Sequence, residues 1–219
     1  MTSLKNTGIR MKDKVLLFIN GDAPKSFPNL DNYRLIACTD GAFHYLKDLD
    51  FPLGKLDFIS GDFDSHSGSD ENVYHEKFIH TPDQNRTDFH KALEIIFEKG
   101  FKNVDILGGS GGEQDHFLGN LTVAFGFKDR MNIQFYDEFS EYYFIPKSFL
   151  AKKMKGRIVS LYPFPFAENI ITKGLQWPLD NVNADMTKDM MIRNFAVEDD
   201  VSIEYQKGDL LFFAGKKRM

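Results

Sequence analysis

The sequence is poor in cysteine and has no long apolar segment. Cys38 is the only cysteine among 219 residues, so no disulfide can form within the chain. It lies in the apolar run 35–38, which favours a buried thiol over a nucleophile. No apolar run approaches the ~20 residues that span a bilayer, and none follows the early basic residues as in a signal peptide. These absences predict a cytoplasmic protein with no membrane partner.

Positive charge is also scarce. The formal net charge is −5, and the Lys and Arg residues are scattered, apart from a basic tail at 216–218. Nucleic-acid binding depends on clustered Lys and Arg, so the sequence argues against a nucleic-acid partner. The six histidines and the single cysteine show no zinc-binding spacing. An acidic chain can still bind a nucleotide through a divalent cation, or bind a cationic small molecule.

The first two thirds of the chain alternate short apolar runs with helical patterns. The predicted strands are 15–19, 35–38, 56–59, 77–80, 104–107 and 133–136. The clearest helix spans 88–99, with Phe89, Leu93 and Ile96 on one face. Thr87 or Asp88 can cap its start and Gly100 can end it, and a second helix begins near residue 115. This alternation predicts a three-layer α/β/α domain with a mainly parallel sheet.

The pattern changes after residue 137. Strand-like runs at 141–146, 156–162, 170–174, 191–195, 201–205 and 209–213 are separated by Pro, Gly, Asn and Asp, with no convincing helix between them. This is typical of a small all-β sandwich. We therefore divide the chain into an α/β domain, 1–140, and a β-sandwich domain, 141–219.

Two aspartates stand two residues apart where the third strand ends. Gly61 permits a sharp exit from this strand, and Asp62 and Asp64 follow it. A pair of carboxylates at this spacing can reach one Mg²⁺, which usually keeps waters and shares its shell with substrate phosphates. The alternative is an Asx-turn with two solvated side chains.

Polar or glycine-rich residues follow all five of the first predicted strands. The carboxyl ends of parallel strands share one edge of a sheet, and ligands bind in the crevice there. The sequence therefore predicts that five aspartates, distant in sequence, converge at this edge: Asp40, Asp62, Asp64, Asp88 and Asp115.

A glycine-rich loop precedes the second helix. Its four glycines, Gly108, Gly109, Gly111 and Gly112, can expose backbone N–H groups to a phosphate at the positive end of the helix. The loop is neither a Walker A sequence nor the dinucleotide-binding fingerprint. A tight turn without a ligand remains the alternative.

Four further side chains have a structural and a functional interpretation. Asp88 either caps its helix or adds a third carboxylate to the metal site. Gln84 is either solvated or bonded to a substrate ring, and His116 either caps its helix or orients a carboxylate. Trp177, the only tryptophan, either packs in a turn or forms a stacking platform for a flat or cationic ligand.

These pieces, in this order, resemble the thiamine pyrophosphokinase family. The resemblance extends from residue 15 to about residue 213 and rests on five segments: 39–42, 59–65, 83–93, 107–120 (Leu-Gly-Gly, Asp-His and Asn120) and 174–179. It implies transfer of a pyrophosphoryl group from ATP to the hydroxyl of thiamine, giving thiamine diphosphate and AMP. It also implies an N-terminal catalytic domain, a C-terminal thiamine-binding domain and a homodimer with active sites at the subunit interface.

The resemblance also implies a role for each matching residue. Asp62, Asp64 and Asp88 would hold Mg²⁺, with Asp40 and Asp115 near the phosphates. The residues expected on the nucleotide side are Asp40, Gly41, Gly108, Gly109, Gly111, Gly112, His116, Arg86 and Lys91. Those expected on the thiamine side are Gln84, Asp88, Trp177, Arg193 and Asn194, with Trp177 stacking on the pyrimidine bound to the other subunit.

Three positions depart from the family pattern. Ala42 replaces a second glycine, Glu113 replaces an arginine before the Asp-His pair, and Arg193 replaces the serine of a Ser-Asn pair. Arg86 or Lys91 could supply the basic contact that Glu113 lacks. Two alternatives stay open: another Mg-dependent nucleotide or nucleotide-sugar transferase, and a thiamine-binding sensor without turnover.

Overall fold

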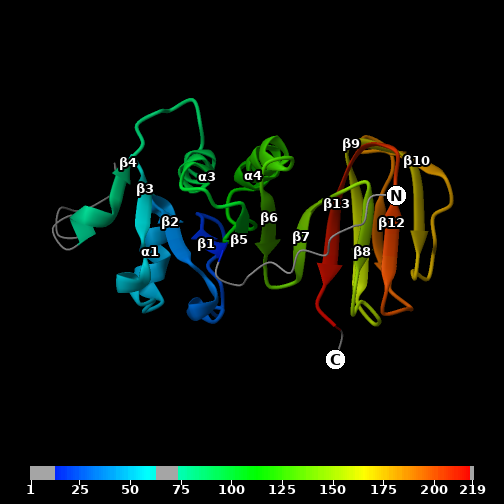
Figure 1. Ribbon diagram of the computed structural model, residues 1–219, viewed down its shortest axis with the longest axis horizontal. Coiled ribbons are helices and arrows are strands. Elements are labelled where there is room, and N and C mark those ends of the chain that lie inside the picture. Colours follow the sequence, from blue (N-terminus) through cyan, green and yellow to red (C-terminus); the bar gives the residue numbers. More distant parts are fainter. Residues whose placement is uncertain (1–12, 63–73, 218–219) are drawn as a thin grey trace. The chain divides into compact units, whose positions relative to one another are not determined.

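The computed structural model describes residues 13–62 and 74–217 (Figure 1). The chain separates into two compact units, Met1–Ile133 and Gln134–Met219. The division falls within strand β6 (Asn132–Tyr136), a few residues before the position that the sequence suggests. Among the helices described, none is long and apolar enough to cross a membrane.

The first unit is built on a parallel sheet. Its strands are β1 (Lys14–Phe18), β2 (Leu35–Thr39), β3 (Phe58–Gly61), β4 (Phe78–His80) and β5 (Asn103–Leu107), arranged in the order β4-β3-β2-β1-β5. Every neighbouring pair in this series is parallel. Strands β2, β3 and β4 follow one another on one side of β1, and β5 pairs with the opposite edge of β1. The strand order therefore reverses between β1 and β5, where open α/β sheets bind ligands.

Within residues 13–62 and 74–217, three α-helices connect these strands or follow them: α1 (Asp40–Asp48), α3 (Asp88–Glu98) and α4 (Gln114–Phe127). Thr87 caps α3, because its hydroxyl accepts the N–H of His90 at 3.2 Å. Gly100, at φ +88°, follows the last turn, as the sequence suggests. Three short 3₁₀ helices are η2 (Leu30–Asn32), η3 (Leu53–Lys55) and η4 (His75–Lys77).

Apolar side chains from β1 and β2 form the core beneath α1. Phe18, Phe27 and Phe51 meet edge to face with ring centroids 4.9–5.8 Å apart. Cys38 is fully buried in this core, which confirms its predicted structural role. Burial raises the pKa of its thiol well above the usual value, and nearby Asp40 adds to the shift.

The second unit is antiparallel. Its strands are β7 (Ser140–Ile145), β8 (Ser148–Ala151), β9 (Ile158–Lys173), β10 (Val182–Asp185), β11 (Met191–Phe195), β12 (Val201–Glu204) and β13 (Lys207–Gly215). The order is β6-β7-β13-β9-β12-β8, and β10 and β11 also pair with β9. Among the residues described here, no helix interrupts these strands.

The prediction of separate strands at 156–162 and 170–174 was wrong, because both belong to β9. Pro163 and Pro165 made the sequence look interrupted. β13 pairs with β9 on both sides of a register shift near Gly208, so the ladder continues past the prolines.

Candidate functional site

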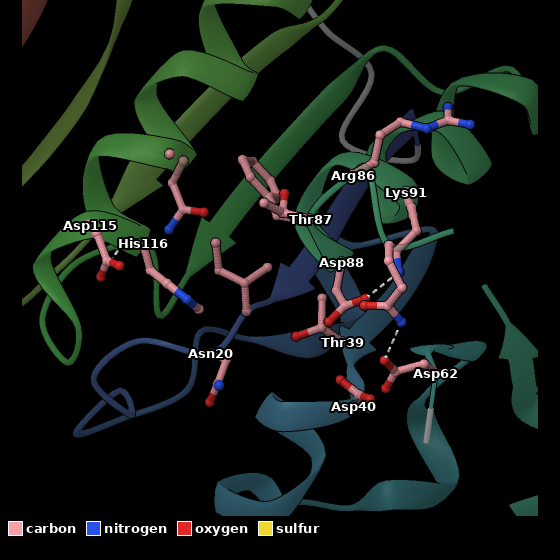
Figure 2. Close-up of a pocket in the computed structure, with 15 residues that line it drawn as sticks. Asn20, Thr39, Asp40, Asp62, Arg86, Thr87, Asp88, Lys91, Asp115 and His116 are labelled. Atoms are coloured by element: carbon pink, nitrogen blue, oxygen red, sulfur yellow. Dashed lines mark hydrogen bonds and ion pairs between the residues drawn. The ribbon is translucent and has the colours of Figure 1, made fainter. Parts of the chain in front are cut away.

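A cavity of about 350 Å³ lies at the carboxyl ends of the parallel strands (Figure 2). Residues that follow each of the five strands β1 to β5 line it. They are Ile19, Asn20, Thr39, Asp40, Asp62, Gln84, Arg86, Thr87, Asp88, Phe89, Lys91, Asp115, His116, Gly119 and Asn120. The structure thus brings together four of the five aspartates expected to converge. Asp64 lies outside the described residues.

Three carboxylates, from Asp40, Asp62 and Asp88, occupy one side of the cavity (Figure 2). Asp40 opens α1, is 7% exposed, and its Oδ1 accepts the N–H of Gly41 at 2.6 Å. A Cβ on residue 61 would lie 2.3 Å from Asp40 Oδ2, so only glycine lets this carboxylate lie against the end of β3. Asp62 Oδ2 accepts a hydrogen bond from Gln84 Nε2 at 2.9 Å.

Lys91 is the buried cation of the cavity wall. It is 6% exposed, and its Nζ lies 2.7 Å from Asp88 Oδ1. The same Nζ donates to the carbonyl oxygens of Thr81 at 2.8 Å and Asp83 at 3.3 Å. Because Thr87 caps α3, the carboxylate of Asp88 is available for this ion pair.

Arg86 also lines the cavity, but its guanidinium is bound elsewhere. Its Nε lies 2.8 Å from Asp83 Oδ2, and a terminal nitrogen lies 2.5 Å from Glu94 Oε2. The N–H of Asn85 and the Arg86 guanidinium lower the pKa of the Asp83 carboxyl, and the two carboxylates raise the pKa of Arg86. Figure 2 shows the Arg86 side chain extending away from Asp62.

Asp115 and His116 form the other end of the cavity, at the start of α4 (Figure 2). Asp115 Oδ1 accepts the N–H of His116 at 3.0 Å, and His116 Nε2 lies 3.5 Å from Glu113 Oε2. Glu113 therefore faces a histidine from the position where the family pattern has arginine.

The glycine-rich loop does not line this cavity; it packs on the turn after β1. Gly108 has φ +76°, and a Cβ there would lie 2.1 Å from the Ile19 carbonyl oxygen. The Gly112 N–H donates to Asp22 Oδ1 at 3.1 Å, and a Cβ on Gly111 would meet the same carboxylate at 2.0 Å. The Asp22 carboxylate thus accepts the hydrogen bond of the Gly112 N–H, a group that the sequence analysis expected to bind a phosphate.

Gly41 and Gly109 are likewise absent from the cavity lining. A Cβ on Gly41 would lie 2.6 Å from the Asn20 side chain, and the Gly109 carbonyl accepts a hydrogen bond from Asn120 Nδ2 at 3.1 Å.

The sequence analysis assigned no role in the site to Asn20, Thr39, Thr87, Phe89 or Gly119, although all five line the cavity. Asn20 and Thr39 directly follow predicted strands, as the chosen aspartates do. The position directly after a strand was a usable signal for both residues, but an uncharged side chain is a weaker indication of a metal site than an aspartate.

The second unit has its own pocket of about 240 Å³, lined by Trp177, Arg193 and Asn194 together with apolar side chains. The apolar lining is Val159, Leu161, Leu175, Leu179, Met190, Met191 and Ile192. Trp177 is 58% exposed in the single chain, so its ring is not a core side chain.

Asn194 holds the backbone of Trp177 in both directions. Its Oδ1 accepts the N–H of Trp177 at 3.2 Å, and its Nδ2 donates to the Trp177 carbonyl at 2.7 Å. The neighbouring Arg193 has φ +57° at a register shift of β11, and its N–H donates to Ser160 Oγ at 2.9 Å. A non-glycine residue in this region is strained, which is a common feature of functional sites.

Comparison with known proteins extends these observations. The model described as "Thiamin pyrophosphokinase, catalytic domain" matches residues 28–135, and the model "Thiamin pyrophosphokinase, vitamin B1 binding domain" matches residues 147–210. The thiamine pyrophosphokinase of Bacillus subtilis is 26% identical over 159 residues, covering 69% of this chain and 74% of that protein. Thiamine pyrophosphokinase 1 of rice (Oryza sativa) is 27% identical, covering 86% of this chain and 82% of that protein.

Solved structures support the same assignment at the level of the fold. A thiamin pyrophosphokinase family protein from Enterococcus faecalis aligns with a TM-score of 0.81 at 22% identity, over 94% of this chain and 100% of that chain. The yeast enzyme aligns with a TM-score of 0.78 at 19% identity, over 93% and 86%. With both domain models matched in order along the sequence, the chain belongs to the thiamine pyrophosphokinase family.

Proposed function

We propose that this protein is an enzyme that transfers the pyrophosphoryl group of ATP to the hydroxyl of thiamine. The products are thiamine diphosphate and AMP. The observation that carries the proposal is the acidic cavity of the first unit. It lies where the strand order of the parallel sheet reverses, in the part of the chain that matches the catalytic-domain model of this family. The comparisons favour neither a nucleotide-sugar transferase nor a binding protein without turnover.

We infer that Mg²⁺ binds at the carboxylate side of this cavity. Within the described ranges, no cluster of three or more His, Cys, Asp or Glu side chains is arranged as a metal site. Mg²⁺ does not require one, because it commonly takes one or two protein carboxylates and completes its shell with water and phosphate. Four aspartates line the cavity together with one lysine and one arginine, a net negative lining that suits a divalent cation.

Asp62 and Asp88 would supply the protein ligands, together with Asp64. When bound, the ion would neutralise phosphate charge, as in other phosphoryl transfers. Asp40 and Asp115, on opposite sides of the cavity, would then lie near the phosphates.

The reaction needs little covalent help from the protein. The thiamine hydroxyl oxygen forms a bond to the β-phosphorus of ATP, the bond from that phosphorus to the AMP oxygen breaks, and the hydroxyl proton is lost. Catalysis then depends on holding the hydroxyl in line with the leaving oxygen. The amide of Gln84, which donates a hydrogen bond to Asp62, would orient the thiamine ring beside the metal site.

We further propose that 1–140 form a three-layer α/β/α catalytic domain and that 141–219 form a β-sandwich that binds thiamine. Trp177 would stack on the pyrimidine, with Arg193 and Asn194 beside it. Each Trp177 would complete the partner's site in a homodimer; its indole is 58% exposed in the single chain, which leaves a ring face for a ligand bound to the partner.

The test is incubation of the purified protein with ATP, Mg²⁺ and thiamine, with AMP and thiamine diphosphate measured by chromatography. We expect both products in equal amounts, only in the complete mixture. Thiamine binding without AMP release would instead indicate a sensor. Absence of thiamine binding, with stabilisation by a UDP-sugar, would indicate a nucleotide-sugar transferase.

A further inference from the structure

We propose that Lys91 is a positioning residue: it fixes the carboxylate of Asp88 and the turn that presents Gln84, and it does not contact the phosphates. The inference rests on the proposed function, because it assigns a role within that site. Three acceptors already surround Lys91 Nζ.

A lysine ammonium has three N–H donors, and Lys91 has three acceptors within hydrogen-bond distance. One is Asp88 Oδ1, and the other two are the carbonyl oxygens of Thr81 and Asp83. The lysine residue is 6% exposed, so breaking these bonds to reach a phosphate would leave partly buried carbonyl groups unpaired.

These contacts join two parts of the acidic side. The Thr81 N–H donates to the Gly61 carbonyl at 2.8 Å, which ties the turn to the end of β3. Three residues further on, Gln84 donates to Asp62. Lys91 therefore holds, through one atom, both Asp88 and the turn whose amide contacts Asp62.

Removing Lys91 should have two separate effects, one on the affinity for the metal and one on the alignment of the reactants. Loss of a positive charge beside Asp88 should strengthen attraction for a divalent cation. Loss of the bond to Oδ1 should also free Asp88 to turn, so that the ion and the substrates are held out of line. A positioning role thus predicts undiminished metal binding together with slow turnover.

The experiment compares Lys91→Met with the wild type. We expect kcat to fall roughly 100-fold, as for a misplacement of about 1 Å. Calorimetry with Mn²⁺ and ADP should show a dissociation constant for the metal that is equal to or lower than that of the wild type. If kcat is unchanged, or if only the KM for ATP rises, Lys91 is not a positioning residue.

Lys77→Met is a matched control. Lys77 Nζ also donates to backbone carbonyls, of Gly54 at 2.7 Å and Leu56 at 2.5 Å, but it does not line the cavity. We expect this variant to lose some thermal stability with kcat retained. An equal loss of kcat in both lysine variants would show a general effect on folding and overturn the proposal.

If Lys91→Met is too unstable to assay, the double variant Asp88→Asn, Lys91→Met removes the unpaired charge. The melting temperatures of the two single variants and the double variant then form a thermodynamic cycle. We expect a coupling equivalent to more than about 5-fold, and additive effects would contradict the proposal. The calorimetry and this cycle need no turnover, so a wild type inactive on thiamine would refute the proposed function alone.

Discussion

The two pockets described above differ in almost every chemical respect. The cavity of the first unit lies where parallel strands end and is lined by carboxylates, amides and an ammonium. The pocket of the second unit lies beside antiparallel strands, and most of its lining is aliphatic or sulfur-containing around one indole. The first is suited to a metal and phosphates, and the second to a flat organic ring. Changes in the first should affect chemistry, and changes in the second should affect substrate affinity.

The largest effect is expected from Asp62→Asn. The amide oxygen can still accept the hydrogen bond from Gln84, but the charge that attracts a cation is lost. We expect kcat to fall by roughly 10³-fold. The melting temperature should change little, because carboxylates that repel one another add little stability. Steady-state kinetics and a thermal melt test this, and a wild-type rate would refute the metal assignment.

Gly61→Ala should come next. Its Cβ would lie 2.3 Å from Asp40 Oδ2, so the carboxylate must move. We expect roughly a 10- to 100-fold loss of kcat and a destabilisation of about 1–3 kcal/mol, measured by kinetics and denaturant unfolding. Gly54→Ala is the control, since a Cβ there meets nothing within 4 Å. Equal behaviour of the two variants would contradict a special requirement at residue 61.

Trp177→Ala should affect the second pocket alone. We expect the KM for thiamine to rise roughly tenfold through loss of stacking and cation–π attraction, with the KM for ATP unchanged. Trp177→Phe should retain most of the affinity. If both KM values rise together, Trp177 has a packing role and the contrast between the two pockets fails.

The smallest effect is expected from Asp22→Ala, which removes the acceptor of the Gly112 N–H. Loss of one hydrogen bond to a carboxylate at an exposed turn suggests about a threefold rise in the KM for ATP. Asp22→Asn keeps an acceptor oxygen and should behave as the wild type. A lower KM in Asp22→Ala would instead mean that the Asp22 carboxylate competes with phosphate for this loop.

Sequence reasoning found the parallel sheet because its strands are short apolar runs, each followed by polar residues. It found α3 because the apolar face, Thr87 and Gly100 agree on one helix. It missed α1, which begins Asp-Gly and is only nine residues long, since both residues are poor helix formers. The helix forms because Ala42, Phe43 and Leu46 are buried in the core, a tertiary effect that the propensities of the first residues do not show.

The site shows the same limit. Strand ends predict which loops meet, and four aspartates from those loops do line one cavity. The sequence analysis did not resolve how the side chains that line this cavity pair with one another. Lys91 and Arg86 both seemed available for phosphate, yet one is held by Asp88 and two carbonyls and the other by Asp83 and Glu94. The i,i+3 spacing of Asp88 and Lys91 in one predicted helix was a usable signal for their ion pair. The two carbonyls that hold Lys91 and the contact of Arg86 with Glu94 depend on the path of the turn, which residue spacing does not encode.

The bonds from Asn194 reach only the main chain of residue 177. Any residue with a backbone N–H can therefore keep these two bonds, because they do not involve the indole. The hydrogen bonds that hold the turn are therefore independent of the side chain that would stack on a ligand. A library of aromatic and aliphatic residues at position 177 should fold alike and differ mainly in the rings that they accept, which makes this turn a practical starting point for altering substrate range.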